Sequence, residues 1–403
     1  MPSYRVGKVT IASGSPDFED EIASAHSDKI RPLCLCQRQG IETYIARLDD
    51  KHIVKRMPGT GSQHDSACEH FEPPASLSGL GDVMGKAIQN QTDGNTVLKL
   101  DFSLTRSGGR AAPKPSENPG ATVKSDASKL TLLGLLHYLW HEADLHRWAA
   151  SFRGKRNWRV VRSRLLDAAS HKMSKKMPLL DRLYIPEPFF ADHAEDIDLR
   201  RSSFLRRFRS SDPKKRELIL IVAEVKSMEP ARYGTKIVVK HAPRFSIFLD
   251  DKAHAQVKKK FSAEIAINEA NETSHLMMIA TASVNEANAA VIEEIGLMLV
   301  NSDWLPVESI EEFSLLETLT TDSRSFLKGL RFNVRDRPLA SALLTDTKPP
   351  VGLYLVPPDE DAAFAGIIDE LSAQTGIKAW KWHLEDGTWP EIPDSDRQEN
   401  GNE

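Results

Sequence analysis

All three cysteines of this 403-residue chain lie within its first 68 residues, in two short clusters. Cys34 and Cys36 stand in the stretch RPLCLCQ, and Cys68 stands in SQHDSACEH between His64 and His70. A disulfide framework uses an even and denser supply of cysteines, whereas clustered thiols in a reducing compartment serve as metal ligands or nucleophiles. The two clusters therefore favour a metal site over a disulfide-bonded core.

The spacing of these residues predicts a zinc site. Cys34, Cys36, Cys68 and His70 supply three thiolates and one imidazole, the number and softness of ligands that tetrahedral Zn²⁺ prefers. Metal binding at a site that is unformed in the unfolded chain contributes directly to folding, so we expect a structural role. His64 is the alternative fourth ligand, or a group that orients a ligand. Two other interpretations stay open: the cysteines are small buried apolar residues, or one of them is a nucleophile.

Two resemblances support this interpretation. The order Cys-x-Cys, a gap of 31 residues and then Cys-x-His resembles the ligand pattern of the SWIM-type zinc finger. Across nearly the whole chain, the three N-terminal cysteines, RMPGTGSQH, LSGLG, LLHYLWHEADLHRW and KGLRFN resemble a bacterial protein family of unknown function with three such cysteines. The resemblance implies no established activity, and it implies an association with mobile genetic elements.

One stretch of low complexity divides the chain. Residues 105–129 (TRSGGRAAPKPSENPGATVKSDASK) hold Pro, Gly and small polar residues, which bury too little apolar surface to offset the entropy of ordering. We therefore predict an α+β multidomain protein made of successive modules. These are a zinc-binding N-terminal β-hairpin module (1–104), a flexible linker (105–129), a helical winged-helix-like module (130–190), a basic connector (191–217), an α/β sheet domain (218–357), and a helix with an acidic C-terminal tail (358–403).

Local patterns predict the elements of these modules. TYIARL and HIVKRM, joined by Asp49, Asp50 and Lys51, indicate a β-hairpin between the two cysteine clusters. LTLLGLLHYLW indicates a buried helix, and NWRVVRSRLLDAA a second helix that turns Trp158 inward. ELILIVAEV, TKIVVKHA and RFSIFLD indicate three consecutive strands, followed by a helix and the strand HLMMIATASV.

Charge along the chain suggests a polyanionic partner. Residues 145–216 hold 19 Lys and Arg against 8 Asp and Glu, whereas residues 356–403 hold 3 against 12. At the second helix and just before it, Lys155, Arg156, Arg159 and Arg162 face away from the apolar side. Phosphate contact by them would give salt-sensitive binding of nucleic acid, with duplex DNA the favoured form. The alternative is that oppositely charged segments pack on one another.

Other functions have weaker signals. Glu224-Val225-Lys226 ends a predicted strand, as the E-x-K of restriction-type nucleases does, so a metal-dependent nuclease or phosphotransfer enzyme using Glu224 and Lys226 is the alternative function. Because a partner acid on an earlier strand is missing, we predict binding rather than catalysis and assign no catalytic residue. A third alternative is a scaffold whose C-terminal region, with Trp380, Trp382 and Trp389, engages another protein. The sequence lacks a run long enough for a membrane span and the features of a signal peptide, so we expect a cytoplasmic protein.

Overall fold

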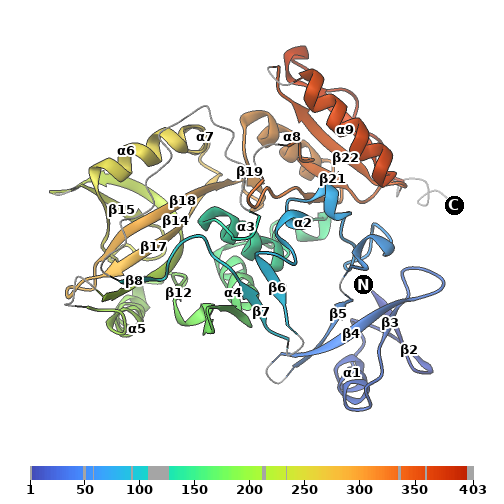
Figure 1. Cartoon of the computed structure of the whole chain (residues 1–403), viewed down its shortest axis with the longest axis horizontal. Coiled ribbons are helices and arrows are strands. Elements are labelled where there is room, and N and C mark those ends of the chain that lie inside the picture. Colours follow the sequence, from blue (N-terminus) through green and yellow to red (C-terminus); the bar gives the residue numbers. More distant parts are fainter. Residues whose placement is uncertain are drawn as a thin grey trace. The chain divides into compact units, whose positions relative to one another are not determined.

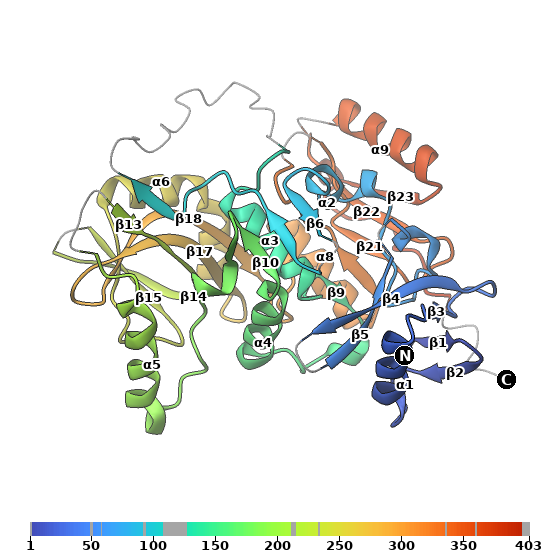
Figure 2. The ribbon, with the colours of Figure 1, turned by 60° about the horizontal axis from the view of Figure 1, so that its bottom comes forward.

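The computed structural model describes residues 2–48, 51–57, 59–91, 94–107, 127–210, 215–232, 234–334, 337–358 and 361–396. The chain forms two compact units (Figures 1 and 2). Unit 1 combines residues 1–81 with residues 324–327 and 340–403, and unit 2 comprises residues 82–323 and 328–339. Mixed helices and sheets occur in both, so the α+β class predicted from the sequence is confirmed.

The N-terminal part of unit 1 is a five-stranded sheet in the order β2-β1-β3-β4-β5. Its elements are β1 (Ser3–Val6), β2 (Val9–Ala12), α1 (Phe18–Ser27), β3 (Leu33–Cys34), β4 (Ile41–Leu48) and β5 (Lys51–Arg56). The predicted hairpin is present as β4 and β5, which pair from Thr43↔Arg56 to Leu48↔Lys51, whereas Asp49 and Asp50 lie outside the described residues. A small core between the sheet and α1 contains Ile22 and also the buried Cys34 and Cys68.

The C-terminal part of unit 1 builds a second sheet. Its elements are β20 (Phe326–Lys328), β21 (Ala342–Leu344), β22 (Val351–Val356), α9 (Asp361–Thr375) and β23 (Lys378–His383). β22 and β23 are parallel and are joined by α9, as a parallel pair requires a crossover connection, and α9 lies beside both strands (Figure 2). Trp380 and Trp382 are buried, and Trp389 packs edge to face on Trp382 at 5.1 Å.

Unit 2 begins with short strands and three helices. They are α2 (Leu80–Val83), β6 (Ile88–Asn90), β7 (Thr96–Leu98), β8 (Thr105–Ser107), α3 (Leu132–Glu142), β9 (Arg147–Trp148), α4 (Trp158–Ala169), β10 (Lys172–Ser174), β11 (Met177–Pro178) and β12 (Leu183–Tyr184). The two predicted helices are present as α3 and α4, with Trp158 buried. Thr131 and Asn157 cap them, each side chain accepting a hydrogen bond from the main-chain N–H three residues later.

A self-contained winged helix over residues 130–190 is not confirmed. The hairpin after α4 is made of β10 and β11, but β10 also pairs in parallel with β7, which comes from the other side of the predicted linker. The four strands form one sheet in the order β11-β10-β7-β6. Residues 105–107 of that linker form β8, which pairs with β13 (Lys215–Glu217), and residues 108–126 lie outside the described part of the chain.

A closed five-stranded barrel forms the rest of unit 2. Its elements are α5 (Ala194–Arg206), β14 (Ile219–Pro230), β15 (Thr235–Val239), β16 (Ile247–Leu249), α6 (Asp251–Lys260), α7 (Ser262–Ala270), β17 (His275–Val284), β18 (Ala290–Val300), β19 (Pro306–Val307) and α8 (Ile310–Thr321). The strands pair around a ring, β14-β15-β16-β18-β17, which β14 closes by pairing with β17. Only the pairing of β16 with β18 is parallel within this ring.

Strand alternation explains the barrel interior. On β14 the odd-numbered Ile219, Ile221 and Ala223 point inward, and across the register they meet inward residues of β17 such as Ala280. Helices α6 and α7 lie over one end of the barrel (Figure 1). Apolar side chains from this segment, including Phe261, belong to the barrel core. A register shift between Val225 and Ser227 lets β14 pair with β17 along its first half and with β15 along its second.

The predicted α/β sheet domain over residues 218–357 is divided between two sheets. Its first part forms the barrel, which is mostly antiparallel, and its last strands, β21 and β22, belong to the sheet of unit 1. One sheet and two separate sheets would give the same sequence pattern of strands and helices. Alternation of apolar residues identifies the buried face of each strand but not the strand with which it pairs.

Candidate metal centre

The first pair of cysteines is positioned by β3. This strand lies between β1 and β4, so Cys34 sits opposite Tyr4 and Ile41 with its side chain fully buried. After β3 the chain turns, and the N–H of Gly40 donates a hydrogen bond to the carbonyl of Gln37. Cys36 stands just before this turn and is half-buried, and its Sγ and that of Cys34 lie within 4.8 Å of the ligand atoms of the second cluster.

The second cluster is shaped by a tight loop. The N–H of Cys68 donates to the carbonyl of Asp65, and the Asp65 side chain accepts from the N–H of Ala67, so residues 65–68 fold back on themselves. This turn brings Cys68 beside His64, four residues earlier. Gly61 lies so close to Glu72 that an added Cβ would stand 2.7 Å from the Glu72 Cβ, so the base of the loop is closely packed.

Four potential ligand atoms meet where the two clusters face each other. The Sγ atoms of Cys34, Cys36 and Cys68 and a ring nitrogen of His64 all lie within 4.8 Å of one another. The Cys34 and Cys68 sulfurs are 3.7 Å apart, and His64 Nδ1 lies 3.3 Å from Cys36 Sγ and 3.8 Å from Cys68 Sγ. In a tetrahedral zinc site, bond lengths of roughly 2.3 Å to sulfur and 2.0 Å to nitrogen place neighbouring ligand atoms about 3.5 to 3.8 Å apart. The side chains present therefore fit a zinc ion.

The electrostatics of the cluster suit a metal ligand set. Burial, together with the nearby Arg56 guanidinium, lowers the pKa of His64, so its imidazole stays neutral and keeps the lone pair that a ligand needs. The hydrogen bond from Cys68 lowers the pKa of Cys34, whereas burial raises the pKa of Cys36. His64 Nε2 is buried without a hydrogen-bond partner, which leaves Nδ1 as the nitrogen that faces the thiols.

His70, the fourth ligand expected from the sequence, lies beside this group of four rather than in it. Its Nε2 is 2.7 Å from the hydroxyl of Tyr4, and its main-chain N–H donates to Cys68 Sγ. Its ring packs against that of His64, with 5.3 Å between the ring centres. His64, the alternative in the sequence analysis, is the imidazole within the group of four, with its Nδ1 3.3 Å from Cys36 Sγ.

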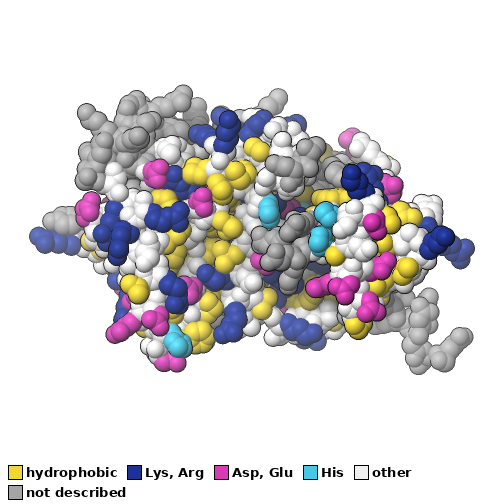
Figure 3. Space-filling view, turned by 90° about the horizontal axis from the view of Figure 1, so that it is seen from below, with side chains coloured by type: hydrophobic (Ala, Val, Ile, Leu, Met, Phe, Trp, Pro, Cys, Tyr) yellow, Lys and Arg dark blue, Asp and Glu magenta, His cyan; other side chains and the backbone are white. Residues whose placement is uncertain are grey.

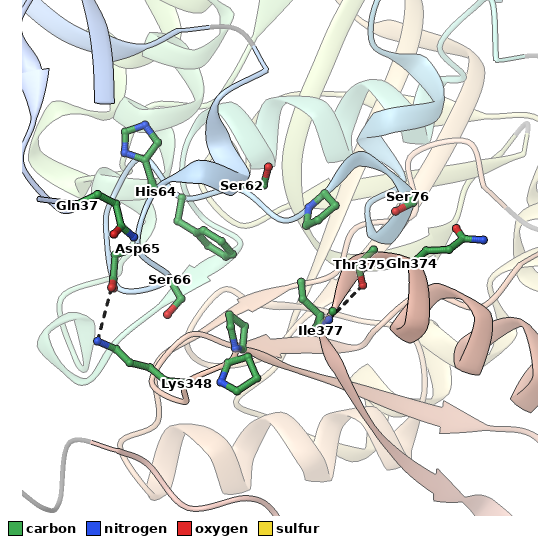
Figure 4. A pocket seen from close by; sticks show the side chains of 15 residues that line it. Gln37, Ser62, His64, Asp65, Ser66, Ser76, Lys348, Gln374, Thr375 and Ile377 are labelled. Atoms are coloured by element: carbon green, nitrogen blue, oxygen red, sulfur yellow. Dashed lines mark hydrogen bonds and ion pairs between the residues drawn. The ribbon is translucent and has the colours of Figure 1, made fainter. Parts of the chain in front are cut away.

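The loop that carries His64 and Cys68 is braced by the C-terminal part of unit 1. Ser66 Oγ donates a hydrogen bond to the carbonyl of Thr345, and Lys348 Nζ lies 3.6 Å from Asp65 Oδ2. These residues border a pocket, and Figure 4 shows the Asp65 and Lys348 side chains facing each other at one side of it, with His64 on the same loop. The pocket is lined by Gln37, Ser62, His64, Asp65, Ser66, Phe71, Pro74, Ser76, Lys348, Pro349, Pro350, Gln374, Thr375, Gly376 and Ile377.

Two of the four basic residues expected to contact phosphate face the interior of unit 2. The Arg156 guanidinium donates to the carbonyls of Leu145, Arg147 and Asp303, and burial lowers its pKa to about 10. Arg162 Nε donates to the carbonyl of Ile185 at 3.1 Å. These two side chains stabilise the unit from within.

The other two basic residues, Lys155 and Arg159, are exposed, and Arg159 lies over the ring of Phe190. On the face of the molecule in Figure 3, Lys and Arg side chains lie in separate groups with acidic side chains between them. Figure 3 shows no continuous basic surface among the described residues that face this way, and nucleic-acid binding by Lys155 and Arg159 stays a prediction.

Glu224 belongs to a cluster that the sequence analysis missed. It is 3% exposed, and its Oε1 lies 2.6 Å from His275 Nδ1 and 2.5 Å from Lys240 Nζ. Burial works against ionisation of this carboxyl, but the hydrogen bonds from His275 and Lys240 outweigh it and lower its pKa. The ring of His275 stacks on Trp304 at 4.2 Å. Lys226 is exposed and is not among these partners, and the nuclease alternative stays a prediction. No signal in the sequence connects residues 224, 240 and 275, since their proximity depends on strand register.

Fold and site together define an α+β protein with a Cys₃His cluster that could hold a metal ion. The sequence matches the family described as "Protein of unknown function (DUF1173)" over residues 4–385, and the chain belongs to this family. This confirms the family resemblance noted from the sequence. No curated protein and no solved structure matches the chain. None of the helices in the described ranges is long and apolar enough to cross a membrane.

Proposed function

We propose that this chain is a zinc-containing protein in which Cys34, Cys36, Cys68 and His64 hold one structural Zn²⁺. The observation that carries the proposal is the convergence of four soft ligand atoms within 4.8 Å of one another. Four protein ligands fill a tetrahedral site, whereas catalytic zinc keeps a position for water or substrate, so the role of the ion is structural. It would fasten the sheet of β1–β5 to the loop of residues 59–72. The free thiols that it requires suit a reducing cytoplasm, where we place the protein.

Metal analysis of the purified protein tests the zinc proposal. Wild type is expected to carry about one zinc per chain, and Cys68→Ser to lose it. His64→Ala and His70→Ala form a matched pair, since each removes one imidazole from the same loop. We expect His64→Ala to abolish zinc retention during dialysis against a chelator and His70→Ala to weaken the affinity only about 10- to 100-fold, as loss of a neighbouring support does. The reverse order would assign His70 as the ligand, and wild type without zinc would remove the proposal.

The second part of the proposed function is nucleic-acid binding. The observation that favours it is the small closed barrel of unit 2, with helices inserted between its third and fourth strands, an architecture that proteins use to bind oligonucleotides and oligosaccharides. The exposed Lys155 and Arg159 are available for phosphate contact in addition. The association with mobile genetic elements, implied by the family resemblance, agrees with such a partner.

A binding assay at several salt concentrations tests this second part. Binding of nucleic acid that weakens as salt rises is expected, because basic side chains displace counterions from phosphates. Absence of binding at low salt, with the zinc-loaded protein, would overturn it. Running the same assay after chelation separates the two parts of the proposal, since unit 2 does not contain the metal centre.

A further inference from the structure

The order of strands in the barrel is specific. β14, β15 and β16 form an antiparallel meander, α6 and α7 follow, and β17 and β18 complete the ring by pairing with β14 and β16. The third and fifth strands are parallel, and the long first strand is shared between the second and the fourth. This is the Greek-key order of the OB-fold, whose ligands bind on the outer face of strands two and three and at the loops after strands one and four.

In this barrel, strands two and three are β15 and β16, and their outward residues are identified by register. Inward positions such as Ile237 and Ile247 are fully buried and opposite each other. The neighbouring pair, Lys236 and Phe248, therefore points outward, and both residues are half-buried, so part of each remains in contact with solvent. Val291 of β18 lies next to Phe248 in the register and is 39% exposed.

Further basic residues continue the same face. Lys240 follows β15 at an outward position, where its ammonium group pairs with Glu224, and the exposed Lys226 is the extra residue of the β14 bulge, just before Ser227, which pairs with Val238. Arg232, in the loop between β14 and β15, is exposed as well. Glu229 is the acidic residue that lies opposite Lys236 across the register. We name Lys226, Lys236, Val238, Lys240, Phe248 and Val291 the barrel face.

We propose that the barrel face binds single-stranded nucleic acid, with a base stacked on Phe248 and the phosphates beside it neutralised by Lys236 and Lys226. This inference rests on the proposed nucleic-acid binding and assigns it a surface and a form of nucleic acid. A ring directly beside a lysine matches the alternation of base and phosphate along a strand. Stacking on an aromatic side chain requires a base face, which a duplex keeps inside its stack and a single strand offers freely. The lysines favour an anionic polymer over a neutral oligosaccharide.

The experiment uses the full-length, zinc-loaded protein and fluorescent oligonucleotides. The probes are an oligothymidylate and an oligouridylate of about 16 nucleotides, within the range of sites that OB-folds cover, and a duplex of the same length. A neutral glucan oligosaccharide is the fourth probe. We expect the single strands to bind more tightly than the duplex. Phe248→Ala should weaken single-strand binding roughly five-fold or more. Lys236→Gln should reduce the slope of log Kd against log salt by about 0.7, the value for one phosphate contact on a single strand.

Two control variants match these changes in chemistry and lie elsewhere on unit 2. Lys259→Gln removes one exposed lysine from α6, and Leu199→Ala removes an apolar side chain that is 62% exposed on α5. Both are expected to bind as wild type does. Circular dichroism verifies that every variant is folded, and because Phe248 and Lys236 point outward, the barrel core is untouched by either change.

Each outcome decides the inference. Weaker binding by Phe248→Ala and Lys236→Gln, with unchanged controls, supports it, and the relative affinities for oligothymidylate and oligouridylate then identify DNA or RNA as the source. If wild type binds but the two variants bind equally well, the barrel face is wrong while the proposed function stands. Equal or tighter binding of the duplex overturns the single-strand inference in the same way. If wild type binds neither form, or binds only the oligosaccharide, the proposed nucleic-acid binding and the inference fall together, while the zinc proposal is unaffected.

Discussion

Replacing Asp346 by Asn should destabilise unit 1 strongly. Both oxygens of Asp346 accept hydrogen bonds from the Arg324 guanidinium at 2.9 Å, and one also accepts from the Ser325 N–H at 2.8 Å. The side chains of Asp346 and Arg324 are only 2% and 9% exposed. Removing one partner leaves the other charge buried without compensation, which costs about 3 to 5 kcal/mol. We therefore expect a loss of this size in the free energy of unfolding of unit 1.

Asp346→Asn should also weaken zinc binding at the candidate metal centre. Thr345, next to Asp346, accepts the hydrogen bond from Ser66 that braces the loop of His64 and Cys68. A loosened segment would hold this loop less firmly, so we expect zinc affinity to fall about ten-fold, the lower end of the effect of lost supports around metal ligands. Competition with a chromogenic chelator measures this change independently of stability.

Hydrogen exchange of the β21 and β22 amides reports the stability of unit 1 without interference from unit 2. Asp369→Asn is the matched control, because Asp369 forms an ion pair with Lys381 at 2.6 Å but is 68% exposed. Exposed pairs contribute about 0 to 1 kcal/mol, so the control should change little. If Asp346→Asn costs no more than Asp369→Asn, the assignment of a large cost to the buried pair is wrong.

Two further predictions concern buried ionisable groups in unit 2. Burial lowers the pKa of His137 from 6.5 to about 4, so the unfolded chain binds more protons in this range, and stability should fall by about 3 kcal/mol as the pH drops from 6.5 to 4. His137→Asn keeps an acceptor for the Phe332 N–H and should flatten this part of the stability profile; an unchanged profile would contradict the assignment. Glu224→Gln should destabilise the barrel at neutral pH by about 2 kcal/mol, less than for a fully buried pair because Lys240 is partly exposed. Since the pKa of Glu224 is lowered in the fold, the difference in the free energy of unfolding between Glu224→Gln and wild type should shrink as the pH falls below about 4.5. Urea unfolding at several pH values measures this difference, and a difference that persists at low pH would contradict the prediction.

The sequence alone was sufficient for features that depend on local patterns. Alternation and turn residues identified the hairpin of β4 and β5, and the apolar stripe identified the buried helix α3. The cysteine clusters indicated the Cys₃His group that could hold a metal ion, because thiols are rare in this chain and their grouping is visible without a fold. The choice between His64 and His70 was open, since both flank Cys68 and only the turn at residues 65–68 decides which ring meets the sulfurs.

Features that depend on strand pairing could not be predicted from the sequence. The barrel requires β14 to pair with β17, from Val225↔Leu276 to Ile219↔Ala282, and the inward pattern of both strands would fit an open sheet equally well. The same limit explains the cluster around Glu224, whose partner His275 lies on the neighbouring strand. The inward orientation of Arg156 was missed for a different reason: its acceptors are main-chain carbonyls, which leave no trace in residue types.

Unit 1 combines segments from both ends of the chain, and this affects the order in which the two units can fold during synthesis. Its N-terminal sheet leaves the ribosome first, but β21, β22 and β23 arrive only after all of unit 2 has been made. Unit 2 can therefore fold before the strands that complete unit 1 have been synthesised. Synthesis of residues 82–339 takes on the order of ten seconds or more at roughly 5 to 20 residues per second. Zinc bound by the thiols before residues 340–396 emerge would hold the N-terminal segment together during this interval. A shortage of zinc in the cell would then affect the growing polypeptide before it affects the finished protein.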